Sequence, residues 1–274
     1  MPLNVQFRFK TTLTGCLFFI LVFVGLPVLA APALAGLNVN RLPETDVEAV
    51  KNLIEKLTPL IKERDERQNL ATLTFPELYA PLNKEEQKFL KSFQKLDGKK
   101  LGVKIPFRGI ATGKEELVVI QGQKIRVKDE EKELPPQFLP PEVYEKYLAM
   151  MAAMEQDIGK RLYVESGYRS SAYQLYLFIF YMKNHDYSIH ETVKFVALPG
   201  YSEHGAPAYQ AIDFINAEGI NGEDNPQEFE DLEENQWLLK NAGAFDFVLS
   251  YPKATGSGIT YEPWHWRHEK KRGK

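Results

Sequence analysis

Apolar residues in the first third of the chain recur at helical spacing. Between residues 44 and 67 they fall three and four positions apart, which predicts a helix with one buried face. A second helix is predicted over residues 84–96, where Asn83 can cap the start and Gly98 can stop the end. Neither helix carries an obvious chemical group, so their charged side chains are interpreted as solvated faces.

The pattern then changes to the shorter period of strands. Short β-type runs separated by glycines are predicted at residues 101–105, 117–120 and 124–127, and residues 121–123 have the composition of a tight hairpin connection. Residues 128–141 are acidic and contain prolines, which predicts a linker or a surface loop. We place a domain boundary in this stretch.

Further helices and strands are predicted from residue 141 onward. The helices are 141–158, 171–183 and 228–242, with helix or loop over 186–198, and the strands are 161–166, 212–215, 245–251 and 259–266. Helices come first and a largely antiparallel sheet follows. This order predicts an α+β fold with helices packed on a small sheet.

The chain is predicted to divide into three parts. Residues 1–35 form a leader, residues 36–136 an N-terminal extension of two helices and short strands, and residues 137–274 the domain that carries the chemistry. The leader has basic, apolar and small-residue regions in the order of a secretory signal peptide, with cleavage after Ala35. The alternative is an uncleaved anchor, because the apolar stretch has about the 20 residues needed to span a bilayer.

Composition narrows the class of protein. The 274 residues are 44% hydrophobic, enough to fill a sizeable core, and the net charge of -3 provides no basic field for a nucleic-acid partner. Membrane contact is expected only through the leader, if it is uncleaved. Cys16 is the only cysteine and lies in the leader, so the mature chain would lack disulfides and thiol nucleophiles. This favours export to a bacterial periplasm or cell envelope over a small disulfide-stapled secreted domain.

Three side chains in the second half have the chemistry of a catalytic zinc site. His204 ends the sequence Pro-Gly-Tyr-Ser-Glu-His, Asp213 ends Ala-Ile-Asp, and His265 lies in Tyr-Glu-Pro-Trp-His-Trp near the end of the chain. Two imidazoles and a carboxylate can hold one zinc ion and leave a fourth position open for water. The sequence therefore predicts one zinc ion per chain and hydrolytic chemistry.

Glu262 is the candidate for the proton-transferring group. It lies three residues before His265, near enough to act on the attacking water as a general base and then on the leaving amine as a general acid. Positions i and i+3 of a strand point to opposite faces, so Pro263 or a bulge must bring both side chains inward. The alternative is that Glu262 only supports the metal ligands.

Five motifs follow one another along the second half of the chain. They are Ser-Gly-Tyr-Arg-Ser at 166–170, Pro-Gly-Tyr-Ser-Glu-His at 199–204, Ala-Ile-Asp at 211–213, Phe-Val-Leu-Ser-Tyr-Pro at 247–252 and Glu-Pro-Trp-His-Trp-Arg at 262–267. In this order they resemble the zinc D-alanyl-D-alanine carboxypeptidases of the vancomycin-resistance (VanY-like) type, in the wider group with lysostaphin-type and Hedgehog-type zinc domains. The resemblance covers roughly half of the chain. It implies a zinc DD-carboxypeptidase that removes the terminal D-alanine from peptidoglycan stem peptides.

The resemblance also implies roles for individual residues. Zinc would be held by the three ligands named above, with Glu262 as the acid/base. Arg169 would meet the substrate carboxylate or the developing oxyanion, which suits a planar guanidinium that can bind a carboxylate with two hydrogen bonds. Ser202 and Gln174 would position the substrate.

Other functions remain open at this stage. The same site could serve an endopeptidase that cuts cross-links or a dipeptidase that acts on free D-Ala-D-Ala. A non-catalytic zinc-containing peptide-binding module is a further alternative, although the presence of both Glu262 and Arg169 argues against it. A serine mechanism is rejected, because Ser92 and Lys95 match Ser-x-x-Lys without the other elements of that family.

The chain departs from the family pattern at a few positions. The interval between His204 and Asp213 is longer by about two residues, and Tyr209 stands at a position that is usually glycine. Asp246 also replaces a usual glycine, and residues 268–269 replace a usual Tyr-Val. These changes leave the predicted ligands in place and affect the shape of the pocket.

Overall fold

The computed structural model describes residues 36–206, 208–223, 225–253 and 261–269. The predicted leader lies outside these ranges. Within them, no helix is both long enough and apolar enough to cross a membrane.

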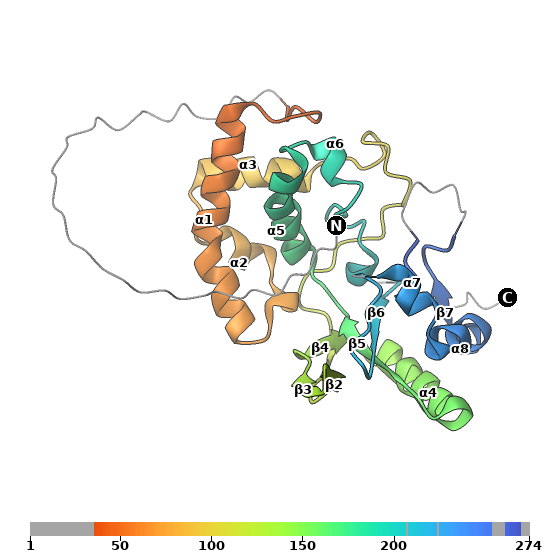
Figure 1. The fold of residues 1–274 in the computed structure, drawn as a ribbon. Coiled ribbons are helices and arrows are strands. Elements are labelled where there is room, and N and C mark those ends of the chain that lie inside the picture. The colour runs from red at the N-terminus through yellow and green to blue at the C-terminus, as the bar shows by residue number, and fades with distance from the viewer. Residues whose placement is uncertain (1–35, 207, 224, 254–260, 270–274) are drawn as a thin grey trace.

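One half of the molecule is a group of helices (Figure 1). It contains α1 (Glu44–Glu66), α2 (Phe75–Tyr79), α3 (Lys84–Gln94), α5 (Ser171–Tyr181) and α6 (Ile189–Thr192). Leu57 of α1, Leu90 of α3 and Phe178 of α5 are fully buried in one apolar core. The helices of the N-terminal extension therefore pack against a helix that follows the Ser-Gly-Tyr-Arg-Ser motif.

The first two predicted helices are confirmed, with small differences at their ends. The Asn83 side chain caps α3 by accepting a hydrogen bond from the Glu86 backbone at 2.9 Å, and the Glu86 carboxylate accepts one from the Asn83 backbone at 2.9 Å. This capping box satisfies backbone donors that the first helical turn leaves free. The short helix α2, capped in the same way by Thr74, was not predicted.

The other half is a four-stranded antiparallel sheet covered by helices. Its strands β5 (Leu162–Ser166), β6 (Ala211–Asn216), β8 (His265–His268) and β7 (Phe247–Leu249) are neighbours in that order. The helices α4 (Pro141–Ile158) and α8 (Glu233–Asn241) contribute to its core, in which Tyr147, Phe214 and Trp237 are buried. The predicted α+β fold is confirmed.

The register of the sheet brings distant parts of the chain together. Asp213 on β6 pairs with Ser166 on β5 and with His265 on β8. Directly opposed residues in an antiparallel pair have Cβ atoms about 4.5–5.5 Å apart. The register of β6 and β8 therefore makes Asp213 and His265 cross-strand neighbours.

The predicted connections of the short strands were wrong. Residues 121–123 do not join a hairpin: β1 (Val118–Ile120) pairs with β4 (Gln137–Leu139), and β2 (Lys124–Val127) pairs with β3 (Glu130–Glu133). The predicted linker 128–141 thus contains two strands.

The missed hairpin has a physical reason. Its two turn residues, Lys128 and Asp129, have φ values of 51° and 66°, whereas tight hairpins usually mark such positions with Asn-Gly or Asp-Gly. Every residue of β3 is exposed, so no apolar alternation identifies it.

Other predicted bounds also differ. Residues 101–105 form turns and irregular chain instead of a strand. The predicted helix 228–242 is interrupted at Leu232, whose backbone is extended, so that α7 (Pro226–Glu230) precedes α8. The predicted strand 259–266 lies partly outside the described residues, and its described part becomes a strand only at His265.

The domain boundary at 136/137 stays a prediction. Both the β1–β4 pair and the helical core contain residues from the two sides of this boundary.

Candidate metal centre

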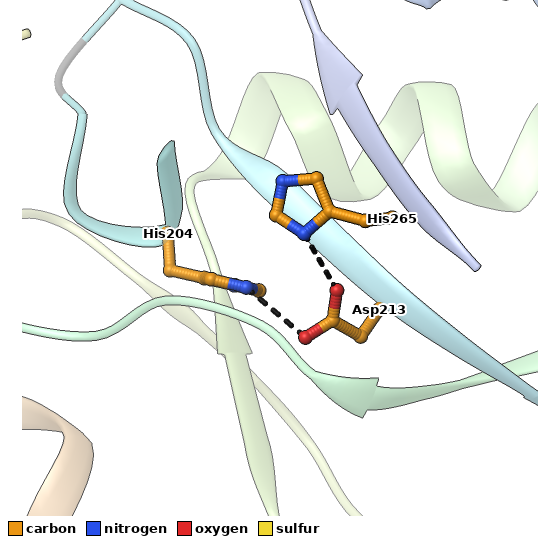
Figure 2. A group of neighbouring side chains, drawn as sticks. All are labelled: His204, Asp213 and His265. Atoms are coloured by element: carbon orange, nitrogen blue, oxygen red, sulfur yellow. Dashed lines mark hydrogen bonds and ion pairs between the residues drawn. The ribbon is translucent and has the colours of Figure 1, made fainter. Parts of the chain in front are cut away.

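The three predicted ligands lie together although they come from different elements (Figure 2). His204 comes from the 3-10 helix η3 (Glu203–Gly205), Asp213 from β6 and His265 from the first position of β8. Ligand atoms from these side chains all lie within 4.8 Å of one another. The Asp213 carboxylate is 3.0 Å from His204 Nε2 and 2.8 Å from His265 Nδ1.

The second nitrogen of each imidazole is held by a different partner. His204 Nδ1 lies 2.8 Å from the Gly167 carbonyl oxygen, which can only accept, so Nδ1 donates and Nε2 is left for a metal. His265 Nε2 lies 3.3 Å from the Glu203 carboxylate, so this nitrogen donates and Nδ1 is left facing Asp213. A hydrogen bond from the far ring nitrogen is the arrangement that metal-ligating histidines usually have. The donor set therefore fits a metal ion.

The electrostatics of the cluster favour positive charge on His265, whereas burial lowers the pKa of His204. Burial lowers the pKa of His265, but Asp213, Glu203 and Glu262 outweigh it and raise this pKa to about 10. Burial raises the pKa of Asp213, but the two imidazoles outweigh it and hold the pKa below its ordinary value. The site thus holds either a proton or a cation between these groups.

A turn solves the problem posed by the spacing of Glu262 and His265. The His265 backbone N–H donates to the Glu262 carbonyl at 3.2 Å, and β8 begins only after this turn. The Glu262 carboxylate consequently reaches to 3.9 Å from His265 Nδ1, the nitrogen on the metal side. Burial, supported by the charges of Asp213 and Glu203, raises the pKa of Glu262 to about 7 in spite of the opposing charge of His265.

Arg169 is held beside the cluster by its neighbours. Its backbone N–H donates to the His204 carbonyl at 3.1 Å, and its guanidinium donates to Gln174 Oε1 and Ser166 Oγ, each at 3.2 Å. Gln174 is buried and donates in turn to the Ala197 carbonyl at 2.7 Å. Gln174 therefore supports Arg169 in this structure.

Ser202 is also buried, and it lies directly before η3. The substrate contacts predicted for Arg169, Gln174 and Ser202 stay predictions.

Glu203 is a functional candidate that the sequence analysis did not single out. Its carboxylate is almost fully buried and bridges His265 Nε2 and Arg108 Nη2, the latter at 2.7 Å. Burial opposes its charge, but His265 and Arg267 lower the pKa of Glu203 to about 2. Its position next to His204 was a signal in the sequence, but its partners are distant in the chain and become apparent only in the fold.

The departures from the family pattern have structural counterparts. Asp246 has a φ of 65°, in the left-handed region that favours glycine, and its carboxylate pairs with Lys146 at 2.8 Å. The lengthened connection from His204 to Asp213 still brings the two side chains together. In this connection, the Arg108 guanidinium lies over the ring of Tyr209, with Arg108 Cζ 4.6 Å from the ring centroid.

Comparisons with known proteins agree with this fold and site. The family model "VanY: D-alanyl-D-alanine carboxypeptidase" matches residues 136–271. The bifunctional D-Ala-D-Ala dipeptidase and D-Ala-D-Ala carboxypeptidase VanXYC of Enterococcus gallinarum is 32% identical over 139 residues, which cover 48% of this chain and 67% of that protein. The fold and site define a carboxypeptidase of the metal-dependent kind. The chain belongs to the VanY D-alanyl-D-alanine carboxypeptidase family.

Solved structures give looser matches. The LdcB LD-carboxypeptidase has a TM-score of 0.44 at 25% identity, covering 58% of this chain and 71% of that one. The vancomycin-resistance D,D-pentapeptidase VanY of a VanB-type cassette, in complex with Zn(II), has a TM-score of 0.41 at 20% identity, covering 61% and 86%. Because these scores are low, the family assignment rests on the sequence matches.

Proposed function

We propose that this protein is a zinc-dependent DD-carboxypeptidase that hydrolyses the terminal D-Ala-D-Ala bond of peptidoglycan stem peptides. The observation that carries the proposal is the convergence of His204, Asp213 and His265, with Glu262 on the metal side of His265. Two imidazoles and one carboxylate form a ligand set typical of catalytic zinc. One zinc ion per chain would fill this site.

The protein's own groups then account for the proton transfers. Zinc, when bound, polarises the substrate carbonyl and makes a water molecule more acidic. Glu262 takes the proton from the attacking water as the new C–O bond forms, and then delivers it to the nitrogen of the departing D-alanine as the amide C–N bond breaks. A raised pKa suits both halves of this task, because the carboxyl group can accept and release a proton near neutral pH.

Arg169 gives the site its preference for a chain terminus. A guanidinium has five N–H donors, and its contacts to Gln174 and Ser166 use two of its nitrogens at 3.2 Å. The remaining capacity suits the carboxylate of the terminal D-alanine. Gln174 would fix the guanidinium, and Ser202 would contact the peptide.

A dipeptidase acting on free D-Ala-D-Ala is the second candidate. It is favoured by the bifunctional activity named for the Enterococcus gallinarum relative. Both reactions break a bond of the same type and need the same ligands, base and arginine. The two reactions differ only in the space that the site must leave for the rest of the stem peptide.

The test is release of D-alanine from a muramyl pentapeptide. We expect release by the purified protein, loss of activity with 1,10-phenanthroline, and recovery when zinc is added back. Parallel assays with free D-Ala-D-Ala and a cross-linked muropeptide distinguish the dipeptidase and endopeptidase. Zinc-loaded protein that binds the pentapeptide without releasing D-alanine would contradict the enzymatic proposal and favour a binding module.

The raised pKa of His265 leads to a pH dependence of metal binding. Zinc requires His265 Nδ1 without its proton, whereas the metal-free protein holds that proton up to a pKa of about 10. Zinc affinity should therefore rise with pH, by up to about tenfold per unit below that pKa, with release of protons. Competition titrations with a chromophoric chelator at several pH values measure this slope, and a flat profile would contradict it.

We also propose that the protein is exported to the bacterial periplasm or envelope. The basic, apolar and alanine-rich order of residues 1–35 supports this. N-terminal sequencing of the exported protein should find Gly36 first, whereas an intact leader in the membrane fraction would indicate an anchor.

A further inference from the structure

A segment of the N-terminal extension lies against the motifs of the metal centre. The Arg108 backbone N–H donates to the Gly200 carbonyl at 2.7 Å. Ala111 exchanges two hydrogen bonds with Ser171: its N–H donates to Ser171 Oγ at 3.0 Å, and its carbonyl accepts from the Ser171 backbone at 2.9 Å. The segment lies before residue 136, where the match to the family begins.

The packing in this region leaves no room for a side chain at two glycines. Gly200 has a φ of 84°, and a Cβ atom placed on it would lie 2.3 Å from the Phe107 ring. A Cβ atom on Gly205, next to His204, would lie 3.3 Å from Ala111 Cβ and 2.4 Å from the Arg169 carbonyl oxygen. The extension thus packs closely against Gly200, within the Pro-Gly-Tyr-Ser-Glu-His motif, and touches Gly205, which follows the motif.

The Arg108 side chain connects the extension to the candidate metal ligand His265 through Glu203. Its Nη2 lies 2.7 Å from Glu203 Oε1, and the other oxygen of the same carboxylate lies 3.3 Å from His265 Nε2. The side chains of Arg108 and Glu203 are 14% and 1% exposed. Arg267 is a weaker partner for Glu203, because it lies 3.9 Å away and binds Glu269 at 2.9 Å.

We propose that Arg108 is a positioning residue for the metal centre: it fixes Glu203, which in turn holds His265 with Nδ1 directed at the metal. The N-terminal extension would therefore complete the site of the proposed function, on which this inference rests. A buried carboxylate needs a compensating cation. Without Arg108, Glu203 would turn toward Arg267, which lies 3.9 Å away, and this movement would loosen the hold on His265.

A double-mutant cycle on zinc affinity tests this coupling. The zinc dissociation constant is measured by chelator competition for wild type, Arg108→Ala, Glu203→Gln and the double variant. Loss of a group that supports a metal ligand usually costs 10–100-fold in affinity, so we expect about that for Glu203→Gln and roughly fivefold to tenfold for Arg108→Ala. In the Glu203→Gln background, Arg108→Ala should cost less than about twofold, because the two residues act in series.

Control variants distinguish a positioning role of Arg108 from a general effect of the substitution on the fold. Arg108→Lys keeps the positive charge and should recover most of the affinity lost in Arg108→Ala, and Arg108→Gln serves if the alanine variant does not fold. Arg67→Ala removes an exposed arginine paired with Glu63 on α1 and should leave zinc affinity unchanged. Circular dichroism checks folding of every variant.

The outcomes are distinct from those for the proposed function. An equal effect of Arg108→Ala in both backgrounds, or no effect on zinc affinity, would overturn the inference while leaving the enzymatic proposal intact. A wild-type protein that binds zinc but does not release D-alanine would overturn the enzymatic proposal, and the cycle would still decide the role of Arg108. A wild-type protein that binds no zinc at this site would overturn both.

Discussion

Replacing Glu262 with glutamine should lower kcat for D-alanine release by about a thousandfold, within the 10²–10⁴ range of general acid–base catalysis. Glutamine has nearly the same shape but cannot accept the proton of the attacking water. Glu262 lies 3.9 Å from His265 Nδ1 and is not one of the three clustered ligands, so the variant should still bind one zinc ion. Steady-state kinetics and zinc analysis of the same preparation measure both effects.

Glu85→Gln is the matched control, because Glu85 is exposed on α3. It should retain wild-type kcat and zinc content. A fall of less than about tenfold in Glu262→Gln would contradict the acid/base role. Loss of zinc from Glu262→Gln would instead make Glu262 a ligand.

Replacing Asp213 with alanine should remove zinc binding and, with it, activity above background. Asp213 is the only carboxylate among the three clustered ligands and contacts both imidazoles, at 3.0 and 2.8 Å. Zinc at about a thousand times its dissociation constant should stabilise the wild type by about 4 kcal/mol, and the variant should lose this increment. Denaturant unfolding with and without zinc isolates the metal contribution from other effects of the substitution.

Asp97→Asn provides the comparison, since Asp97 is exposed and follows α3. It should show the full zinc-dependent stabilisation. If Asp213→Ala kept that stabilisation, zinc would be bound elsewhere in the protein.

The cluster of His204, Asp213 and His265 could be predicted because these residues belong to motifs with characteristic residue types and order. His204, Asp213 and His265 each ended or centred such a motif. Their convergence depends on the register of β6 and β8, which the sequence does not state. The position of Glu262 depends on a backbone turn; the spacing of Glu262 and His265 indicated that the strand must be interrupted there, but not by which structure.

Glu203 and Arg108 could not be predicted for a related reason. A charged residue beside a histidine or in an irregular segment is more often solvated, and its role here comes from partners far away in the sequence. Arg108 and Glu203 are separated by 95 positions, and Glu203 and His265 by 62. Such pairs are set by packing between elements, which local patterns do not record.

The fold was predictable where local signals were strong. Asn83 marked the start of α3 correctly, and α4 ends where predicted, at Ile158, followed by Gly159 in the left-handed conformation at a φ of 68°. The β2–β3 hairpin was missed because Lys128 and Asp129 occupy its turn. The pairing of β1 with β4 joins strands that are not consecutive, so strand propensity alone could not identify it.

The metal site is tested most directly by anomalous diffraction at the zinc absorption edge from crystals of the zinc-loaded protein. We expect one zinc peak per chain, about 2.0–2.2 Å from His204 Nε2, His265 Nδ1 and an oxygen of Asp213. A peak bound by other residues, or His265 turned so that Nε2 meets the metal, would contradict the proposed zinc site.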